Sequence, residues 1–179
     1  MALRGADRRW RWSTLSEPDG VGLRPADAGD RDRLLTWRNE PAVRAASRSI
    51  EEVSSAEHEE WFARRLADPD ARIFIVEHRG DPVGQVRVDR RDGARGEIHV
   101  ALAPSARGRG LAAPALAGAA RRGAQELGLE VIEANVRAGN EPSMRAFVRA
   151  GFAVSRQDRD WIVLEWAAGS GPGLSSPGR

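Results

Sequence analysis

Residues 107–112 constrain the fold of this 179-residue chain more than any other stretch, because glycine there joins a strand pattern to a helix pattern. An apolar run ending at Pro104 precedes the stretch, and an alanine-rich segment ending near Leu127 follows it. Gly108 and Gly110 lack Cβ atoms, so the backbone can turn tightly and a ligand can approach its amides. The first N–H groups of a helix lack intrahelical partners and carry partial positive charge. The pattern therefore predicts either a plain turn or a site for a phosphate or diphosphate.

Arg107 and Arg109 add full charges beside the loop and favour the anion site. The loop is not a Walker loop, because the terminal Gly-Lys-Ser/Thr is missing, and its glycine spacing is not that of a Rossmann fingerprint. It resembles the acetyl-CoA pyrophosphate loop of the GNAT superfamily of N-acetyltransferases, Gln/Arg-x-x-Gly-x-Gly/Ala. Arg107, Gly110 and Ala112 stand at its defining positions.

A second block, residues 140–152, looks like a later motif of the same superfamily, Asn-x-x-Ser-x-x-x-Tyr followed by a Gly-Phe turn. Asn140, Ser143 and Phe147 stand at the three motif positions, so phenylalanine replaces the usual tyrosine. The two blocks lie in the family's order, and the similarity runs from about residue 21 to residue 166.

The resemblance implies an α/β fold: a mixed, mostly antiparallel sheet of six to seven strands flanked by about four helices. Alternating and apolar runs predict strands at residues 21–25, 73–77, 83–89, 97–102, 130–136, 153–157 and 160–166. Helices are predicted at residues 30–39, at residues 54–67, after the glycine loop and after Asn140. Asp30 is the expected cap of the first helix, which Pro41 closes, and Ser54 with Glu57 has capping-box spacing.

Composition narrows the function classes. All 28 basic residues are arginine, the net charge is only +2, and acidic residues are interspersed, which argues against nucleic acid as a partner. There is no cysteine, lysine or tyrosine, and three scattered histidines predict no metal site. No apolar run has the length of a membrane span. We expect a soluble cytoplasmic protein that does not bind a membrane; a homodimer remains open.

The chain divides into three expected regions. Residues 1–20, which alternate arginine and tryptophan near Trp10, are read as a disordered extension, with a membrane or nucleic-acid contact as the alternative. Residues 21–166 form the N-acetyltransferase-like domain, and residues 167–179 form a flexible tail.

The resemblance also implies acetyl-CoA as co-substrate, held between the fourth and fifth strands, with no metal. A free amine attacks the thioester directly, without a covalent enzyme intermediate. Pantetheine pairs with the fourth strand and the diphosphate rests on the loop amides. The cofactor-binding residues so implied are Val100, Leu102, Arg107, Gly108, Arg109, Gly110, Leu111, Ala112, Asn140, Ser143 and Phe147.

The amine must lose a proton, which requires a base or a water relay. Glu97 and His99 alternate onto one strand face and are the candidates. As alternatives to a catalytic role, Glu97 is an exposed strand carboxylate and His99 is a structural imidazole. Without a tyrosine, Ser143 or water must protonate the departing thiolate, unless a thiol of pKa about 8.5 leaves as the anion. Helix capping is a second role open to Asn140 and Ser143.

The acceptor amine should meet the first two helices. Their Trp-Arg-Asn and His-x-x-Trp-Phe sequences resemble a subgroup that includes sugar-nucleotide N-acetyltransferases of the pseudaminic-acid pathway and Rim-type acetyltransferases. The substrate-binding candidates are Trp37, Arg38, Asn39, His58 and Trp61. Arginine can bind an anion and tryptophan can stack on a ring, although aromatic residues at helical spacing also form cores.

We therefore expect an acetyl-CoA-dependent N-acetyltransferase that acts on a primary amine of a small molecule, first an amino-sugar or sugar-nucleotide. Two alternatives stay open: a protein N-terminal acetyltransferase and a non-catalytic acyl-CoA-binding module.

Overall fold

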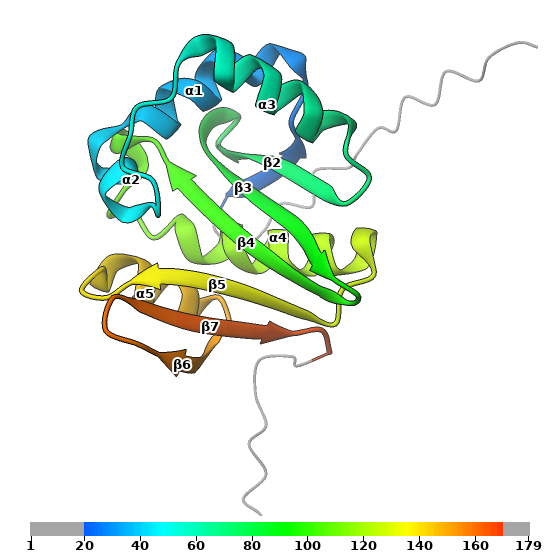
Figure 1. Cartoon of the computed structure of the whole chain (residues 1–179), viewed down its shortest axis with the longest axis vertical. Helices are drawn as coiled ribbons and strands as arrows, with labels where there is room; N and C mark the ends of the chain where they lie inside the picture. The colour runs from blue at the N-terminus through cyan, green and yellow to red at the C-terminus, as the bar shows by residue number, and fades with distance from the viewer. Residues whose placement is uncertain (1–19, 170–179) are drawn as a thin grey trace, which may run out of the picture.

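The computed structural model describes residues 20–169, within which the chain forms seven strands and five α-helices (Figure 1). The strands are β1 (Val21–Pro25), β2 (Ala71–His78), β3 (Asp81–Asp92), β4 (Arg95–Leu102), β5 (Val131–Arg137), β6 (Ala153–Gln157) and β7 (Trp161–Ala167). The helices are α1 (Arg31–Asn39), α2 (Pro41–Ala46), α3 (Ser55–Ala67), α4 (Ala112–Leu127) and α5 (Glu141–Arg149), with 3-10 turns η1 (Ala28–Asp30) and η2 (Pro104–Ala106).

The predicted extension lies outside the described residues except for Gly20, and the predicted tail does so except for residues 167–169, of which Ala167 ends β7. No helix in the described part has the length and apolar character needed to cross a lipid bilayer.

The strands form one sheet in the order β1-β2-β3-β4-β5-β7-β6. Neighbouring strands in this sheet are antiparallel except β4 and β5, which are parallel. The predicted mixed, mostly antiparallel sheet is thereby confirmed. Parallel neighbours need a crossover connection, and α4 supplies it between β4 and β5.

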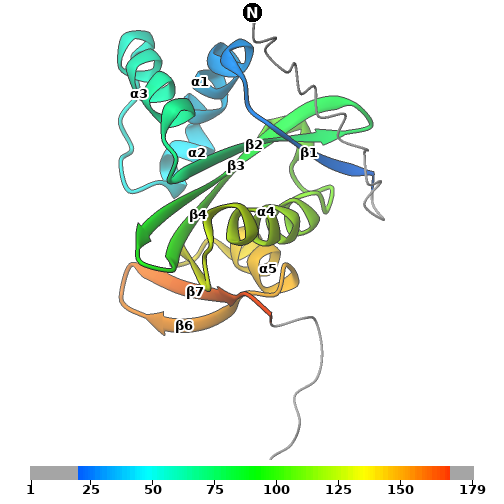
Figure 2. The ribbon, with the colours of Figure 1, turned by 90° about the vertical axis from the view of Figure 1, so that its right-hand side faces the viewer.

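Helices cover both faces of the sheet: α4 and α5 pack on one face, and α1, α2 and α3 lie on the other (Figure 2). Small residues let α4 approach closely, since a Cβ added at Gly123 would lie 2.9 Å from Val88 Cγ1 on β3. The larger core fills the space between α4, α5 and the sheet. A smaller core beneath α1 and α3 consists of Leu34, Trp37, Phe62, Ile73 and Ile75.

Local capping chemistry fixes two helix starts as predicted. Ser54 Oγ accepts a bond from the Glu57 amide, and the Glu57 carboxylate accepts from the Ser54 amide at 3.0 Å, which completes a capping box at α3. The side chain of Asn140 accepts from the Ser143 amide at 3.3 Å and caps α5.

The helix α2 is not among the helices predicted from the sequence. Pro41 does not merely end α1; it begins the separate helix α2. Proline has a fixed φ near that of a helix and lacks an N–H that the first turn could not use anyway. Glu40, with φ −55° and ψ 129°, breaks the helical path between α1 and α2.

The predicted capping role of Asp30 is also wrong. Asp27 caps η1 instead, and the buried Asp30 carboxylate makes no cap bond to α1. Asp30 accepts from the Asp27 amide at 3.0 Å, from Arg24 at 2.7 Å and from Arg33 at 2.8 Å. Burying a carboxylate is costly without such partners, and these bonds tie β1 to the start of α1.

Candidate functional site

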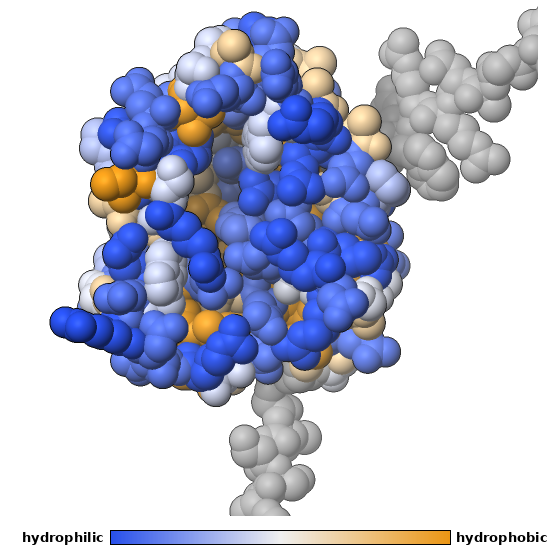
Figure 3. Space-filling view, in the orientation of Figure 1, coloured by the Kyte–Doolittle hydropathy of each residue, from blue (hydrophilic) through white to orange (hydrophobic). Residues whose placement is uncertain are grey.

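A cleft opens where β4 and β5 part. The two strands pair over Arg95 to Val131, Gly96 to Ile132 and Glu97 to Glu133, and no further pairing joins them within the described residues (Figure 1). Beyond these pairs both strands line a cleft of about 890 Å³. The molecular surface on this side is mostly hydrophilic (Figure 3).

The glycine loop forms one end of the cleft. Gly108 and Gly110 have φ values of +72° and +79°, which L side chains rarely adopt. A Cβ added at either position would meet no atom within 4 Å, so the space above the loop is open to a ligand. Of the predicted loop residues, Arg109 does not line the cleft, and the others do: Arg107, Gly108, Gly110, Leu111 and Ala112.

Arg107 links the glycine loop to β4 and to the residue between α1 and α2. Its Nε donates to the Leu102 carbonyl at 3.1 Å, and one terminal nitrogen lies 3.6 Å from the Glu40 carboxylate. That nitrogen is buried and has no hydrogen-bond partner within residues 20–169. Arg107 thus connects the end of β4 to the α1–α2 junction, and its terminal nitrogen can still donate a hydrogen bond to a ligand.

Residues at and in α5 also line the cleft. Asn140, Ser143 and Phe147 line the cleft, as do Val100 and Leu102 on β4. The Phe147 ring is 4% exposed, and its centroid lies 5.1 Å from that of Phe152 in an edge-to-face contact. An apolar ring therefore occupies the place predicted from the tyrosine motif.

Glu97 lies at the floor of the cleft. Its Oε1 accepts from Asn135 Nδ2 at 3.1 Å, and its Oε2 accepts from Arg91 Nε at 2.8 Å. Burial raises the pKa of this carboxyl, but the neighbouring His99 and the bonds from Arg91 and Asn135 lower it by more. Glu97 is consequently ionised at neutral pH.

His99 lies beside Glu97 on the same face of β4. Its Nε2 is 3.6 Å from Glu97 Oε1 and 3.7 Å from Asp89 Oδ2. Burial lowers the pKa of His99 to about 4, and the Arg87 charge adds to this effect against the pull of the two carboxylates. The His99 side chain is 40% exposed, yet its Nε2 is buried and finds no hydrogen-bond partner among the residues that the structure describes. The imidazole is therefore neutral at pH 7.

Of the five predicted acceptor residues, Arg38 lines the cleft and the other four do not. Nη2 of Arg38 donates to the Ser49 carbonyl at 3.0 Å, whereas Nη1 is buried and has no hydrogen-bond partner in the described part of the chain. Burial lowers the pKa of Arg38, and the charges of Arg44 and Arg87 lower it further.

The remaining four serve the packing of α1 and α3. Trp37 is 6% exposed in the smaller core. The Asn39 amide exchanges two hydrogen bonds with the Val53 backbone, at 2.8 and 2.9 Å. His58 is buried, and its Nε2 donates to the Arg31 carbonyl at 2.9 Å. The Trp61 ring reaches the site indirectly, with the Arg87 guanidinium 5.2 Å from its centroid.

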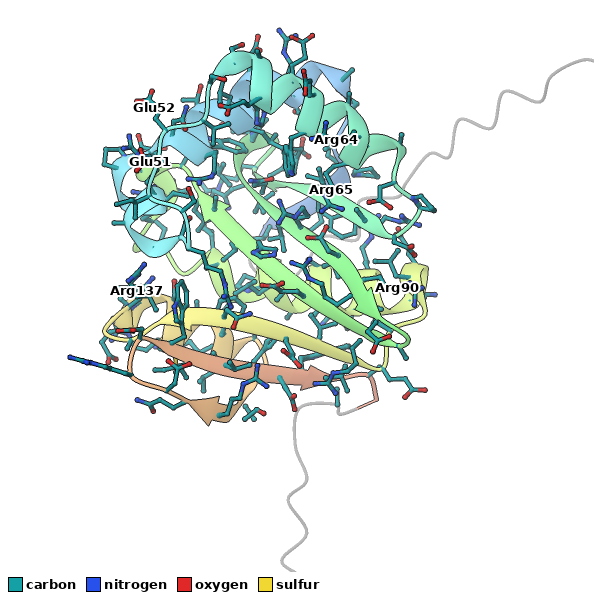
Figure 4. All side chains as sticks on the ribbon, viewed as in Figure 1. Glu51, Glu52, Arg64, Arg65, Arg90 and Arg137 are labelled. Carbon is teal, nitrogen blue, oxygen red and sulfur yellow. The ribbon has the colours of Figure 1, made fainter. Side chains whose placement is uncertain are left out.

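Sequence reasoning missed several lining residues: Arg48, Gln85, Arg87, Asn135, Arg137 and Trp161. Gln85 and Arg87 could have been found, because polar residues alternate on one face of the central strand β3. Arg48 and Arg137 both lie over the Trp161 ring, at 5.1 and 5.0 Å. Figure 4 shows Arg137 near the end of β5 beside the α2 segment. No local signal joins these distant segments.

Among residues 20–169, no group of three histidine or acidic side chains is placed to hold a metal ion. The features that remain are a glycine loop at a helix start, a cleft between parting strands and a polar floor.

Known proteins share this sequence pattern. A family model described as an acetyltransferase (GNAT) domain matches residues 21–153. A mycothiol acetyltransferase from Actinosynnema mirum is 30% identical over 156 residues, which cover 82% of this chain and 49% of that protein. The chain thus spans about half the length of this curated relative.

Solved structures share the fold. A spermidine N-acetyltransferase from Vibrio cholerae, in complex with CoA and spermine, has a TM-score of 0.73 at 20% identity and covers 83% of this chain and 95% of its own. RimJ from Mycobacterium smegmatis, in complex with CoA-disulfide, has a TM-score of 0.71 at 23% identity. The match covers 86% of this chain and 84% of the RimJ chain. The family match covers well over half of the sequence, and the sheet and its parting strands agree with it. The chain belongs to the GNAT acetyltransferase family.

Proposed function

We propose that this chain is an acetyl-CoA-dependent N-acetyltransferase that moves an acetyl group directly to a primary amine of a small molecule. One observation carries the proposal: the glycine loop and the pair Glu97 and His99 line the same cleft between β4 and β5. A single cavity therefore offers a phosphate site and a polar site for an amine.

The nucleotide end is built by backbone groups. The loop amides and the start of α4 supply unpaired N–H groups and partial positive charge for a diphosphate. Beyond Glu97, the edge of β4 that faces β5 has no strand partner in the described part. Such an edge can pair with the amides of a pantetheine arm, and Val100 and Leu102 lie along it.

The thiol end lies near α5. In the proposed transfer, a bond forms between the amine nitrogen and the acetyl carbon, the carbon–sulfur bond breaks, and the sulfur leaves with the electron pair. Phe147 cannot donate a proton, so Ser143 or water does so, or the thiol leaves as an anion because its pKa is about 8.5. The buried Phe147 ring excludes bulk water from this end.

The proton of the amine leaves at the polar floor. Glu97 is ionised and His99 is neutral, so both can accept a proton directly or through water. The lowered pKa values make each a weak base, which favours a relay that passes the proton on to solvent.

For the acceptor we retain an amino-sugar or sugar-nucleotide as the first choice, together with the narrower likeness to the pseudaminic-acid subgroup. The volume of the cleft and its arginine lining support a polar acceptor of this kind. The replacement of tyrosine by Phe147 is the observation that favours a non-catalytic acyl-CoA-binding module instead.

The test is release of free CoA thiol from acetyl-CoA with a panel of amines that includes amino sugars, sugar-nucleotides and short peptides. We expect release above the amine-free rate with an amino sugar or its nucleotide. A preference for peptide N-termini would support a protein N-terminal acetyltransferase. Background rates with every amine, while acetyl-CoA still binds, would identify a binding module.

A further inference from the structure

The cleft is strongly cationic. Within residues 20–169, Glu97 is the carboxylate that lines it, and the side chains of Arg91 and Asn135 already donate hydrogen bonds to this group. Seven arginines line the same cleft: Arg38, Arg48, Arg87, Arg107, Arg137, Arg145 and Arg149. A polycation such as the spermine bound to the Vibrio cholerae structure would be repelled by this lining.

Arg38 has no counterion among residues 20–169. Its Nη2 donates to the Ser49 carbonyl. Among the described residues, its buried Nη1 has no hydrogen-bond partner and no carboxylate forms an ion pair with the guanidinium. Arg44 and Arg87 add positive charge nearby, which is reflected in the lowered pKa of Arg38. A half-buried guanidinium in this state is costly unless an anion joins it.

Arg87 is held in a fixed position beside Arg38. Its Nε donates to Asp89 at 2.8 Å, and its guanidinium lies 5.2 Å from the centroid of the Trp61 ring. These contacts leave its terminal nitrogens available as paired donors, the arrangement that suits a carboxylate or a phosphate. Arg87 is also directly opposite His99 in the register of β3 and β4.

Hydrogen-bond acceptors that could bind the amine group of a substrate lie next to Arg87. Gln85 lies on the same face of β3 as Arg87, and its Oε1 is buried with no hydrogen-bond partner in the part of the chain that the structure describes. Glu97 and His99 lie on the neighbouring strand. Acceptors for N–H groups and donors for an anion therefore lie about one strand spacing apart, roughly 5 Å.

We infer that the acceptor is an anionic amine, a small molecule that carries a carboxylate or phosphate in addition to its primary amine, and that Arg38 and Arg87 bind this anionic group. The inference rests on the proposed N-acetyltransferase function and specifies its substrate class. It sets this chain apart from relatives that act on polyamines.

The experiment compares matched amines in the thiol-release assay. Glucosamine is paired with glucosamine 6-phosphate, and an amino acid is paired with its amide, while spermidine represents the polycations. Because hydrogen bonds to charged groups are worth more than neutral ones, we expect kcat/KM to be about tenfold or more higher for an anionic member than for its neutral partner. The phosphate and carboxylate pairs show which anion the arginines bind.

Substitutions of Arg38 test whether this residue causes the preference for anionic amines. Arg38→Gln should lower kcat/KM for the anionic amine about tenfold. The kcat/KM for the neutral amine and the KM for acetyl-CoA should change little. Arg38→Lys should restore part of the preference for the anionic amine. Arg64→Gln is the matched control, because Arg64 is 70% exposed on α3 and does not line the cleft (Figure 4).

Equal or faster transfer to neutral amines or spermidine would overturn the inference while leaving the proposed function intact. Anion preference that survives in a folded Arg38→Gln variant would overturn the assigned site. Absence of transfer to any amine would overturn the proposed function, and this inference with it.

Discussion

Asn135 on β5 donates a hydrogen bond to Glu97 on β4, across the point at which these strands stop pairing, at 3.1 Å. The same side chain accepts from Arg48 at 3.2 Å. One amide therefore connects the floor of the cleft with the segment after α2, and it orients the carboxylate proposed to take part in proton removal.

Asn135→Ala should lower kcat up to about tenfold, the effect of losing one net hydrogen bond. The KM for acetyl-CoA should change little, because Asn135 is not part of the glycine loop. The pKa that governs the acidic limb of the pH–rate profile should rise, since Glu97 loses a bond that favours its ionised form. An unchanged pH profile together with unchanged kcat would contradict the positioning role.

Phe147→Tyr should give a transfer rate equal to or higher than that of the natural chain. Phe147 lines the cleft where the related motif has tyrosine, and a hydroxyl aimed at the sulfur could donate a proton, help that is typically worth about 10²-fold or more. Thiol release and CoA affinity are measured together. A tenfold or greater loss of rate with CoA affinity retained would show that the site requires an apolar ring.

The free energy of unfolding should fall as the pH drops through the range governed by His99. The imidazole pKa is about 6.5 in an unfolded chain and about 4 in the folded protein. Between these values the unfolded state binds more protons, so stability is full above about pH 7 and declines toward pH 4.

Urea unfolding of the natural chain and of His99→Gln, followed at about pH 7.5, 6 and 5, isolates this contribution. The buried His58, whose pKa is lowered by burial, contributes in the same direction to both proteins. The difference between them should shrink as the pH falls. A difference that is the same at each pH would contradict the lowered pKa of His99.

Ser54→Ala should destabilise the protein by about 1 kcal/mol, because the capping box at the start of α3 is lost. Ser55→Ala is the matched control: it changes a neighbouring exposed serine that is not the cap. Denaturant unfolding of both variants measures the effect. Equal stabilities would show that the box contributes nothing measurable.

Features set by short-range chemistry could be predicted from sequence. The caps at Ser54 and Asn140 depend on residues three positions apart, and the glycine loop depends on adjacent residues. The strand positions could also be predicted, because the alternation of apolar and polar residues along a strand is a local pattern. Pro41 was misjudged, because proline both ends one helix and begins another.

The acceptor side could not be predicted in the same way. His58 and Trp61 share a helical face, but that face packs on the smaller core instead of the cleft. Arg48 and Trp161 meet only because the segment after α2 reaches β7, and no neighbouring residues encode that contact. Only tertiary structure brings Arg38 and Arg87 to one cleft.

We propose that the glycine loop binds the diphosphate of CoA. Gly110→Val places a branched side chain in the open space above the loop, at φ +79°. Gly93→Val is the matched control, because Gly93 also has a positive φ, +51°, with open space around it, but lies in the β3–β4 turn away from the cleft. Both variants should lose comparable stability, about 1–3 kcal/mol, from backbone strain.

Calorimetric titration of CoA into the natural chain and these two variants is the most direct measurement. We predict that Gly110→Val weakens CoA binding tenfold or more, because the side chain occupies the position of the phosphates, and that Gly93→Val binds CoA like the natural chain. Unchanged CoA affinity in a folded Gly110→Val variant would show that the glycine loop does not bind the diphosphate.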